Sequence, residues 1–473
     1  MSDPICLDPR FEILDSSPWC EAPVVSSTIP AETNSNSPLP ATTTAPNPNL
    51  ASSPLLRDSA AFRRAMLRDA FGTTPRSSAT SSESPLAYSL WSLFPAGCSE
   101  HPSLNGDSDG SQGGSDSGTP ETPTPLRLTG FETHDTAPCG PAGMITDLDE
   151  GLGVCANYTN NQHHLFSWDP NSPGAATSII PLSFAPDQVL QGSDDSIYIT
   201  THQNPGLSVV HPIEGSESHH AFPASIPTTL HSSSGRPLTS IRPAFPKGLV
   251  EIDGQIFIAT SNYDEVHDDY LPGTILVFQK ATGSFVALSS SGFNPTSVGE
   301  SNGRLLVVSS GAVDRNGHAT TDGYLDIFDP FSYDLIRSIP LGRRGAGVSG
   351  EITLSPDGRN VLLPTADNSG RILVVDLNDG TKRELTMSSA GVTGDRAFFP
   401  SLQVSPDGRF GVVGNFNDGR VYTVNLADGT ATASPLTVDS NTTDGDGLSD
   451  GLRIGSEYFV GMGPRLLRLQ TGN

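Results

Sequence analysis

The pattern of hydrophobic and polar positions changes near residue 126. Beyond that point, short runs of Val, Ile, Leu, Phe and Tyr are interrupted about every 8 to 12 residues by Gly, Asp, Asn or Pro, and helical periodicity is almost absent. Regularly spaced short strands with turn residues between them are typical of all-β domains. The sequence therefore predicts an all-β fold for residues 126–473.

The predicted strands recur in units of four. The segment ITLSPDGRNVLLPTADNSGRILVVDLNDGTKREL, which begins at Ile352, returns 50 residues later as LQVSPDGRFGVVGNFNDGRVYTVNLADGTATAS, which begins at Leu402. Gly358 and Gly408 supply the positive φ that a tight turn needs between the first two strands. The third strand of each unit is apolar on both faces, as a strand between two neighbouring sheets must be. Each unit is predicted to be a four-stranded antiparallel meander that packs against its neighbours.

Weaker copies precede these two units, and the chain ends in a unit that is one strand short. Residues 126–473 divide into seven units of roughly 50 residues, close to the length of a β-propeller blade. The missing strand is expected from PLRLTGFET, at residues 125–133, because pairing with the last unit closes the ring and removes two free sheet edges. We therefore predict a seven-bladed β-propeller over 126–473. A β-sandwich, the alternative fold, does not account for the repeat length.

Residues 1–125 have a different composition, dominated by Ser, Thr, Pro, Asn and Gly. Such a segment buries too little apolar surface to offset an ordering entropy of roughly 1–2 kcal/mol per residue. We predict a disordered, low-complexity tail or stalk. It contains one short helix over 58–71, capped by Asp58 or Ser59. This helix either docks on a partner or is a marginal helix without one.

The Ser-Pro-Asp-Gly meanders resemble those of the YVTN and lactonase-like superfamily of seven-bladed β-propellers. That superfamily includes bacterial cell-surface proteins and lipoproteins in which a Ser/Thr/Pro-rich leader precedes the propeller. The likeness covers about three quarters of the chain and is clearest in the two units quoted above. It implies the propeller fold and leaves two functions open, because one fold hosts many activities.

The first function is a non-catalytic binding or scaffold propeller, secreted to the bacterial cell surface or the periplasm, with an unknown protein or carbohydrate ligand. The second is a lactonase-like hydrolase with a divalent metal in the central channel. Catalysis there requires polar residues that converge at the starts of the innermost strands. Asp187, Asn294 and Glu351 are the candidates, but they fall at inconsistent offsets within their units. The binding function is therefore the preferred interpretation.

Charge and hydropathy limit the partners and the compartment. Acidic residues outnumber basic residues by 52 to 26, and the formal charge of −26 argues against nucleic-acid binding through phosphate neutralisation. No apolar run approaches the roughly 18 residues of a membrane span. The N-terminal sequence MSDPICLDPRFEILDSS shows neither the basic region nor the apolar stretch of an export signal. An extracytoplasmic location is expected from the resemblance, with a cytoplasmic location as the alternative, and a monomer is expected.

Five cysteines are present, and no two of them form a C-x-x-C pair, which argues against a thiolate metal site. Cys139 and Cys155 flank a segment with the pattern of one short strand. They are the disulfide pair predicted for an oxidising compartment.

The segment TTDGDGLSD, at residues 442–450, places carboxylates at two-residue spacing around a glycine turn. It resembles the D-x-D-x-D-G-L-x-D loops of EF-hand-like proteins and thrombospondin type 3 repeats. The resemblance implies calcium as a cofactor, with Asp444, Asp446 and Asp450 as ligands. Thr442 occupies the first ligand position and no acidic residue follows at the twelfth, so only a weak site is expected. A plain connecting loop is the alternative.

The insertion SNYDEVHDDYLPG, at residues 261–273, joins two predicted strands and is the main candidate for ligand binding, because long loops on rigid scaffolds commonly carry ligand contacts. Its carboxylates are predicted to bind a cation or a basic partner, and its tyrosines to stack on a sugar. The predicted ligand residues are Asn262, Tyr263, Asp264, Asp268, Asp269 and Tyr270. A solvated acidic loop is the alternative.

Two pairs of adjacent histidines, His163-His164 and His219-His220, are candidate metal ligands. Neighbouring residues on a strand point to opposite faces, so neither pair is expected to chelate one ion through both rings. We predict that they are surface histidines.

Overall fold

The computed structural model describes residues 126–134, 144–149, 151–157, 160–171, 178–212, 216–264, 266–313, 319–343, 350–365, 370–387, 399–415, 419–427, 431–437, 448–463 and 465–472. The predicted tail over 1–125, with its helix at 58–71, lies outside these residues. The named elements are all β-strands, which confirms the all-β prediction. The described ranges contain no helix that is long and apolar enough to cross a membrane.

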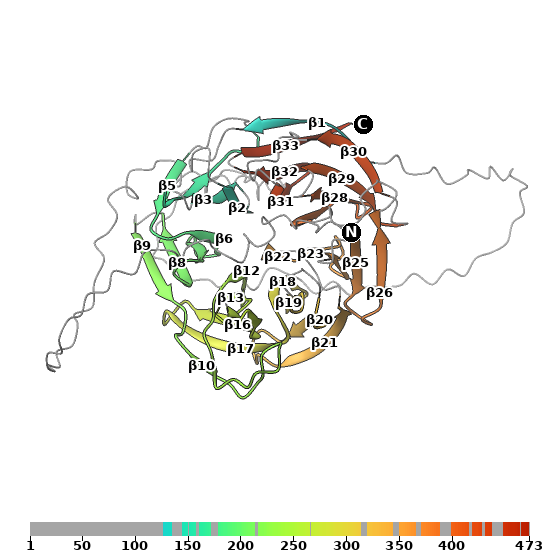
Figure 1. Ribbon diagram of the computed structural model, residues 1–473. Coiled ribbons are helices and arrows are strands. Elements are labelled where there is room, and N and C mark those ends of the chain that lie inside the picture. Colours follow the sequence, from blue (N-terminus) through green and yellow to red (C-terminus); the bar gives the residue numbers. More distant parts are fainter. Residues whose placement is uncertain are drawn as a thin grey trace, which may run out of the picture. The chain divides into compact units, whose positions relative to one another are not determined.

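The strands form seven sheets, each built on four antiparallel strands and one of them extended by a fifth, which follow one another around a ring (Figure 1). Six of these sheets, blades 1 to 6, are meanders in chain order, as the repeat predicts. Blade 1 contains β2 (Met144–Asp149), β3 (Leu152–Asn157), β4 (Gln162–Ser167) and β5 (Ser178–Leu182), and blade 2 contains β6 (Pro186–Gln191), β7 (Ile197–Thr201), β8 (Gly206–His211) and β9 (Ser216–Ala221). Blade 3 contains β12 (Pro246–Ile252), β13 (Gln255–Thr260), β16 (Pro272–Gln279) and β17 (Ser284–Phe293).

The next three blades continue the ring. Blade 4 contains β18 (Pro295–Ser301), β19 (Arg304–Ser309), β20 (Gly323–Phe328) and β21 (Leu335–Gly342), with β22 (Gly350–Glu351) added parallel to β18. Blade 5 contains β23 (Thr353–Leu354), β24 (Asn360–Pro364), β25 (Arg371–Asp376) and β26 (Lys382–Thr386), and blade 6 contains β27 (Ser401–Val404), β28 (Phe410–Asn415), β29 (Arg420–Asn425) and β30 (Ala431–Thr437). Two short hairpins lie outside the blades: β10 (Ile226–Pro227) with β11 (Ser240–Ile241), and β14 (Tyr263–Asp264) with β15 (Asp269–Tyr270).

Blade 7 is built from both ends of the described chain. It contains β31 (Leu448–Ile454), β32 (Glu457–Met462) and β33 (Arg465–Gly472), and β1 (Arg127–His134) supplies its fourth strand. β1 runs antiparallel to β33, from Arg127 opposite Gly472 to His134 opposite Leu466. The first described strand therefore pairs with the last one and closes the ring (Figure 1).

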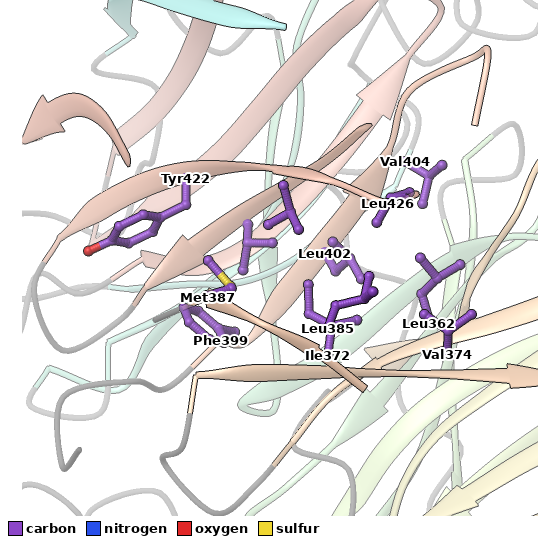
Figure 2. Packing of buried hydrophobic residues seen from close by; sticks show 12 residues of the cluster. Leu362, Ile372, Val374, Leu385, Met387, Phe399, Leu402, Val404, Tyr422 and Leu426 are labelled. Carbon is purple, nitrogen blue, oxygen red and sulfur yellow. The ribbon is translucent and has the colours of Figure 1, made fainter. Parts of the chain in front are cut away.

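The hydrophobic core is divided among the gaps between neighbouring blades, and each of the seven gaps holds one cluster of buried side chains. Ile372 and Val374 of β25 belong to the same cluster as Leu402 of blade 6 (Figure 2). Leu373 and Val375, on the other face of the same strand, join the cluster shared with blade 4. The two-sided apolar pattern predicted for the third strand is confirmed, because both of its faces are covered by neighbouring blades.

Candidate functional site

The two faces of the ring carry different kinds of connection. Because consecutive strands are antiparallel, the turns after the first and third strands of each blade open on one face, which we call the turn face. The connections after the second and fourth strands open on the other face, the loop face. The connections on the turn face are short: 253–254 is one of the shortest, and 168–177 is the longest. The loop face carries longer connections at 222–245, 261–271 and 310–322. Ligand contacts usually sit on such long connections, so the loop face is the candidate functional face.

Two of the loop-face connections fold together into an accessory lobe, defined here as residues 226–241 and 261–271. The first segment contains the hairpin β10–β11 and the second contains β14–β15. Their main chains are joined directly, because the Ser233 amide donates to the Tyr270 carbonyl at 2.8 Å. The Tyr270 amide in turn donates to Ser233 Oγ at 3.2 Å.

Asp269 anchors the lobe. Its side chain is 3% exposed, and its carboxylate accepts hydrogen bonds from Ser233 Oγ at 2.7 Å, the Ser234 amide at 3.0 Å and Ser234 Oγ at 2.7 Å. Burial raises the pKa of Asp269, but the hydrogen bonds from the serines outweigh burial and hold the pKa below its ordinary value. This carboxylate therefore ties the two connections together.

Asp264 makes the second link within the lobe. Arg236 Nη2 donates to Asp264 Oδ2 at 2.6 Å, and His267 Nδ1 lies 2.8 Å from the same oxygen. Burial raises the pKa of Asp264, but the hydrogen bonds from His267 and Arg236 outweigh it and lower the pKa below its usual range. Asp264 and Asp269 are thus both ionised at neutral pH and paired within the chain.

Replacement of Asp269 by Ala is expected to loosen the lobe without unfolding the ring. The change leaves two serine hydroxyls and one amide without their acceptor, and hydrogen bonds to a charged group are worth about 1.5–3 kcal/mol each. Hydrogen exchange at residues 228–240 should accelerate by at least tenfold, while the melting temperature moves little. The exposed turn-face variant Asp334→Ala should change neither quantity, and unchanged exchange in Asp269→Ala would contradict the anchoring role.

Asn262 lies at the base of the lobe and is fully buried, with φ of +57°. Its Nδ2 donates to the Pro272 carbonyl at 2.8 Å and to Thr274 Oγ1 at 2.7 Å, and its Oδ1 accepts from the Ala244 amide at 3.1 Å. Asparagine tolerates the left-handed conformation better than most residues do. Asn262 therefore fixes the direction in which the hairpin leaves blade 3.

The structure brings all six predicted ligand residues into the lobe. Asn262, Asp269 and Tyr270 are buried, Tyr263 and Asp264 are partly exposed, and Asp268 is exposed and accepts a hydrogen bond from Tyr263 OH. Their role as ligand contacts stays a prediction. Sequence reasoning missed Arg236 and the two serines, whose residue types carry no signal until the fold places them beside the acidic hairpin.

Three rings form what we call the aromatic row, which leads from the lobe toward the starts of the inner strands. The Phe245 ring lies 6.4 Å from that of Tyr263 and 5.0 Å from that of His202, between ring centroids, and both arrangements are T-shaped. His202 Nδ1 lies 3.3 Å from Asp187 Oδ2, at the start of β6. His202 and Phe245 were also missed by sequence reasoning, because they come from different blades.

The three candidates for channel catalysis make different contacts: Asp187 lies beside His202, whereas Asn294 and Glu351 contact other residues. Asn294, with φ of +53°, donates from Nδ2 to Ser310 Oγ at 2.7 Å. Glu351 contributes its main chain to β22, where it pairs with Val298. Within the described ranges, no group of three or more His, Cys, Asp or Glu residues is placed to hold a metal ion.

Of the predicted calcium ligands, Asp444 and Asp446 lie outside the described residues, so the calcium site stays a prediction. Asp450 lies in β31, where its Oδ2 accepts from the Leu148 amide of blade 1 at 3.0 Å. Asp147, in β2, repeats the contact by accepting from the Val189 amide of blade 2 at 2.8 Å. These carboxylates therefore join the inner strands of three consecutive blades.

The buried carboxyl groups of Asp147 and Asp450 also influence each other electrostatically. Burial, followed by the charge of Asp450, raises the pKa of Asp147 well above its ordinary value. Burial raises the pKa of Asp450 to about 6. Each carboxyl group therefore holds its proton to a higher pH than an exposed aspartate does.

Cys155 lies buried in β3 and is disulfide-bonded. The other four cysteines, Cys139 among them, lie outside the described residues, so the pairing with Cys139 stays a prediction. His163 is 2% exposed, and the prediction of a surface histidine is wrong for it. The pleat of β4 places His163 on the same face as Leu165, which packs in the gap between blades 1 and 2.

No family model and no curated protein sequence matches this chain. Solved structures match in fold. A streptogramin B lyase structure has a TM-score of 0.50 and 11% identity, and the match covers 72% of this chain and 97% of that chain. A catalytically inactive histidine-to-alanine variant of virginiamycin B lyase from Staphylococcus aureus, solved with quinupristin, has a TM-score of 0.50 and 12% identity, with coverage of 72% and 98%. At this identity the likeness shows the fold alone, which is the seven-bladed β-propeller.

Proposed function

We propose that this chain is a non-catalytic binding or scaffold propeller that presents its loop face to a protein or carbohydrate ligand. We propose further that it acts as a monomer at the bacterial cell surface or in the periplasm. The Ser/Thr/Pro-rich composition of residues 1–125 supports that location, since a stalk of this kind would hold a propeller away from its anchor.

The accessory lobe is the observation that carries the proposal. Hydrogen bonds to two ionised carboxylates join its segments, so a preorganised projection stands on the loop face. Preorganised surfaces bind with a smaller entropic cost than mobile loops do. At the end of the hairpin, Val266 is 88% exposed and the His267 side chain is 51% exposed, and both are available to a partner.

The proposal is tested by replacing residues 264–269 with Gly-Gly. This change retains the pair of Tyr263 with Tyr270 and closes the hairpin with a two-residue turn. The wild-type chain and the variant are screened on arrays of peptides, glycans and soluble metabolites. We expect the wild type to retain a ligand that the lobe variant loses and that the turn-face variant Phe331→Ser keeps. Equal binding by the lobe variant, or no ligand for the wild type on any array, would contradict the proposal.

The contact between His202 and Asp187 favours a second candidate, the lactonase-like hydrolase. A histidine beside a carboxylate at the start of an inner strand stands where catalysis in the channel needs a base. Among the described residues, no three His, Cys, Asp or Glu side chains are grouped to hold a metal ion, so this candidate function depends on His202 and Asp187. Assays of a lactone panel, with and without chelator, should show hydrolysis that His202→Ala abolishes, and uniform inactivity would count against this function.

A further inference from the structure

We propose that the aromatic row of His202, Phe245 and Tyr263 is a carbohydrate-binding site, in which the backbone holds Phe245 in a strained conformation so that its ring faces the ligand. The inference rests on the proposed function, because it names the ligand class of the loop face.

The backbone of Phe245 adopts φ of +55°. Bulky residues rarely occupy this left-handed region, and residues that do so tend to cluster at functional sites. The Phe245 carbonyl accepts from the Ser261 amide at 3.0 Å, which holds the main chain in place. The strain is therefore maintained by the fold and is not a feature of a free loop.

The internal repeat shows what this backbone position requires. In blade 4 the equivalent residue is Asn294, which also precedes the proline that opens the inner strand. Asn294 has φ of +53°, and its carbonyl accepts from the Ser310 amide at 2.9 Å. The turn is thus made equally well by an asparagine, which tolerates the conformation at little cost. The turn therefore does not require a phenylalanine at position 245. We infer that this residue is present because its aromatic ring contacts a ligand.

The Phe245 ring is partly exposed and lies between two other partly exposed rings that come from separate segments of the chain. His202 follows β7, Phe245 precedes β12, and Tyr263 begins the lobe hairpin. Aromatic rings supply a large apolar area with little conformational freedom to lose. The apolar C–H face of a sugar ring matches such a surface, and its hydroxyl groups need polar partners at the edges.

The charges beside the row favour a neutral ligand over a cationic one. Asp187 contacts His202 at 3.3 Å, and Asp264 is already paired with Arg236 at 2.6 Å. A cationic ligand would have to compete with Arg236 for the carboxylate of Asp264. The exposed carboxylate of Asp268, beside Tyr263 OH, is placed to accept hydrogen bonds from hydroxyl groups. A neutral, polyhydroxylated ring ligand therefore fits the row best.

The test is affinity electrophoresis of the full chain in gels that contain xylan, glucomannan, mixed-linkage β-glucan or galactan. We expect at least one polysaccharide to retard the wild type. Phe245→Asn should weaken the binding at least tenfold without lowering the melting temperature, because the asparagine relieves the strain. Phe245→Tyr, which keeps the ring, should retain the binding.

Tyr333 provides a matched control, since it is an aromatic residue of positive φ, +62°, on the turn face. The centroid of its ring lies 6.5 Å from the centroid of the Phe257 ring, and its OH donates to Gln255 Oε1 at 2.5 Å. Tyr333→Asn should therefore lower the melting temperature and leave the polysaccharide binding intact.

Three results would overturn the inference: no retardation by any polysaccharide, unchanged binding by Phe245→Asn, or a fall in melting temperature in that variant equal to that of Tyr333→Asn. If the lobe variant loses a peptide ligand while no polysaccharide binds, the proposed function stands and this inference fails. If the wild type retains no ligand on any array or gel, both fail.

Discussion

A chain that begins at residue 121 is expected to melt within about 2 °C of the full-length chain, whereas a chain that begins at residue 136 should melt at least 10 °C lower and aggregate. The shorter chain lacks β1, which pairs with β33 along its length. It also loses Leu128 and Phe131 from the cluster between blades 6 and 7. β33 then becomes an open edge that can pair with other chains.

Differential scanning calorimetry and gel filtration check this expectation. The point variant Leu128→Ala in the full-length chain is the control, because Leu128 is 4% exposed and its truncation should cost about 2–4 kcal/mol while the ring stays closed. Equal melting temperatures for the two truncated chains would show that β1 does not stabilise the ring.

The propeller could be predicted because its evidence is repeated along the chain. Each meander carries its own turn signal, and the apolar residues on both faces of β25 report that a sheet lies on each side of it. Such signals are local, so they survive without any knowledge of distant contacts. The repeat length then leaves few ways to arrange seven identical sheets.

The accessory lobe could be predicted only in part, because its stability depends on contacts between distant segments. The acidic residues of 261–273 are visible in the sequence as candidate ligands. The serines that satisfy Asp269 stand 35 and 36 positions earlier, in a different connection. No local pattern shows that a carboxylate will be used as an internal anchor, since this depends on which donors the fold brings to it.

Of the aromatic row, only Tyr263 could be predicted from the sequence, for a related reason. The strain at Phe245 arises from the way the chain enters β12, and residue type alone predicts nothing unusual there. When blades 3 and 4 are superposed, Phe245 occupies the same positive-φ position as Asn294. Phenylalanine is the unusual residue at this position. Where one repeat departs from the others at a geometrically demanding position, the departure points to a function that the scaffold does not require.

The second large effect is expected at Asp147 and Asp450, two buried carboxyl groups of blades 1 and 7 that influence each other electrostatically. In the folded chain the pKa of both groups is above the ordinary value of 3.8, so the folded state binds more protons than the unfolded state in the range above pH 4. Their contribution to stability is fully present below about pH 4. It is lost as the pH rises through about 6 for Asp450 and through the raised pKa of Asp147.

Asp147→Asn should therefore stabilise the ring at alkaline pH. The amide oxygen still accepts from the Val189 amide, and the amide N–H still donates to Asp450, but the side chain no longer ionises. At pH 8 the variant should be more stable than the wild type by about 2 kcal/mol, and at pH 4.5 the difference should nearly vanish. Asp334→Asn is the control, because that side chain is exposed on the turn face and is not among the groups that act on Asp147, so its difference from the wild type should be the same at both pH values. Thermal unfolding at the two pH values measures the gap. If the gap between Asp147→Asn and the wild type is the same at both pH values, the ionisation of Asp147 does not affect the stability of the ring, and the prediction is wrong.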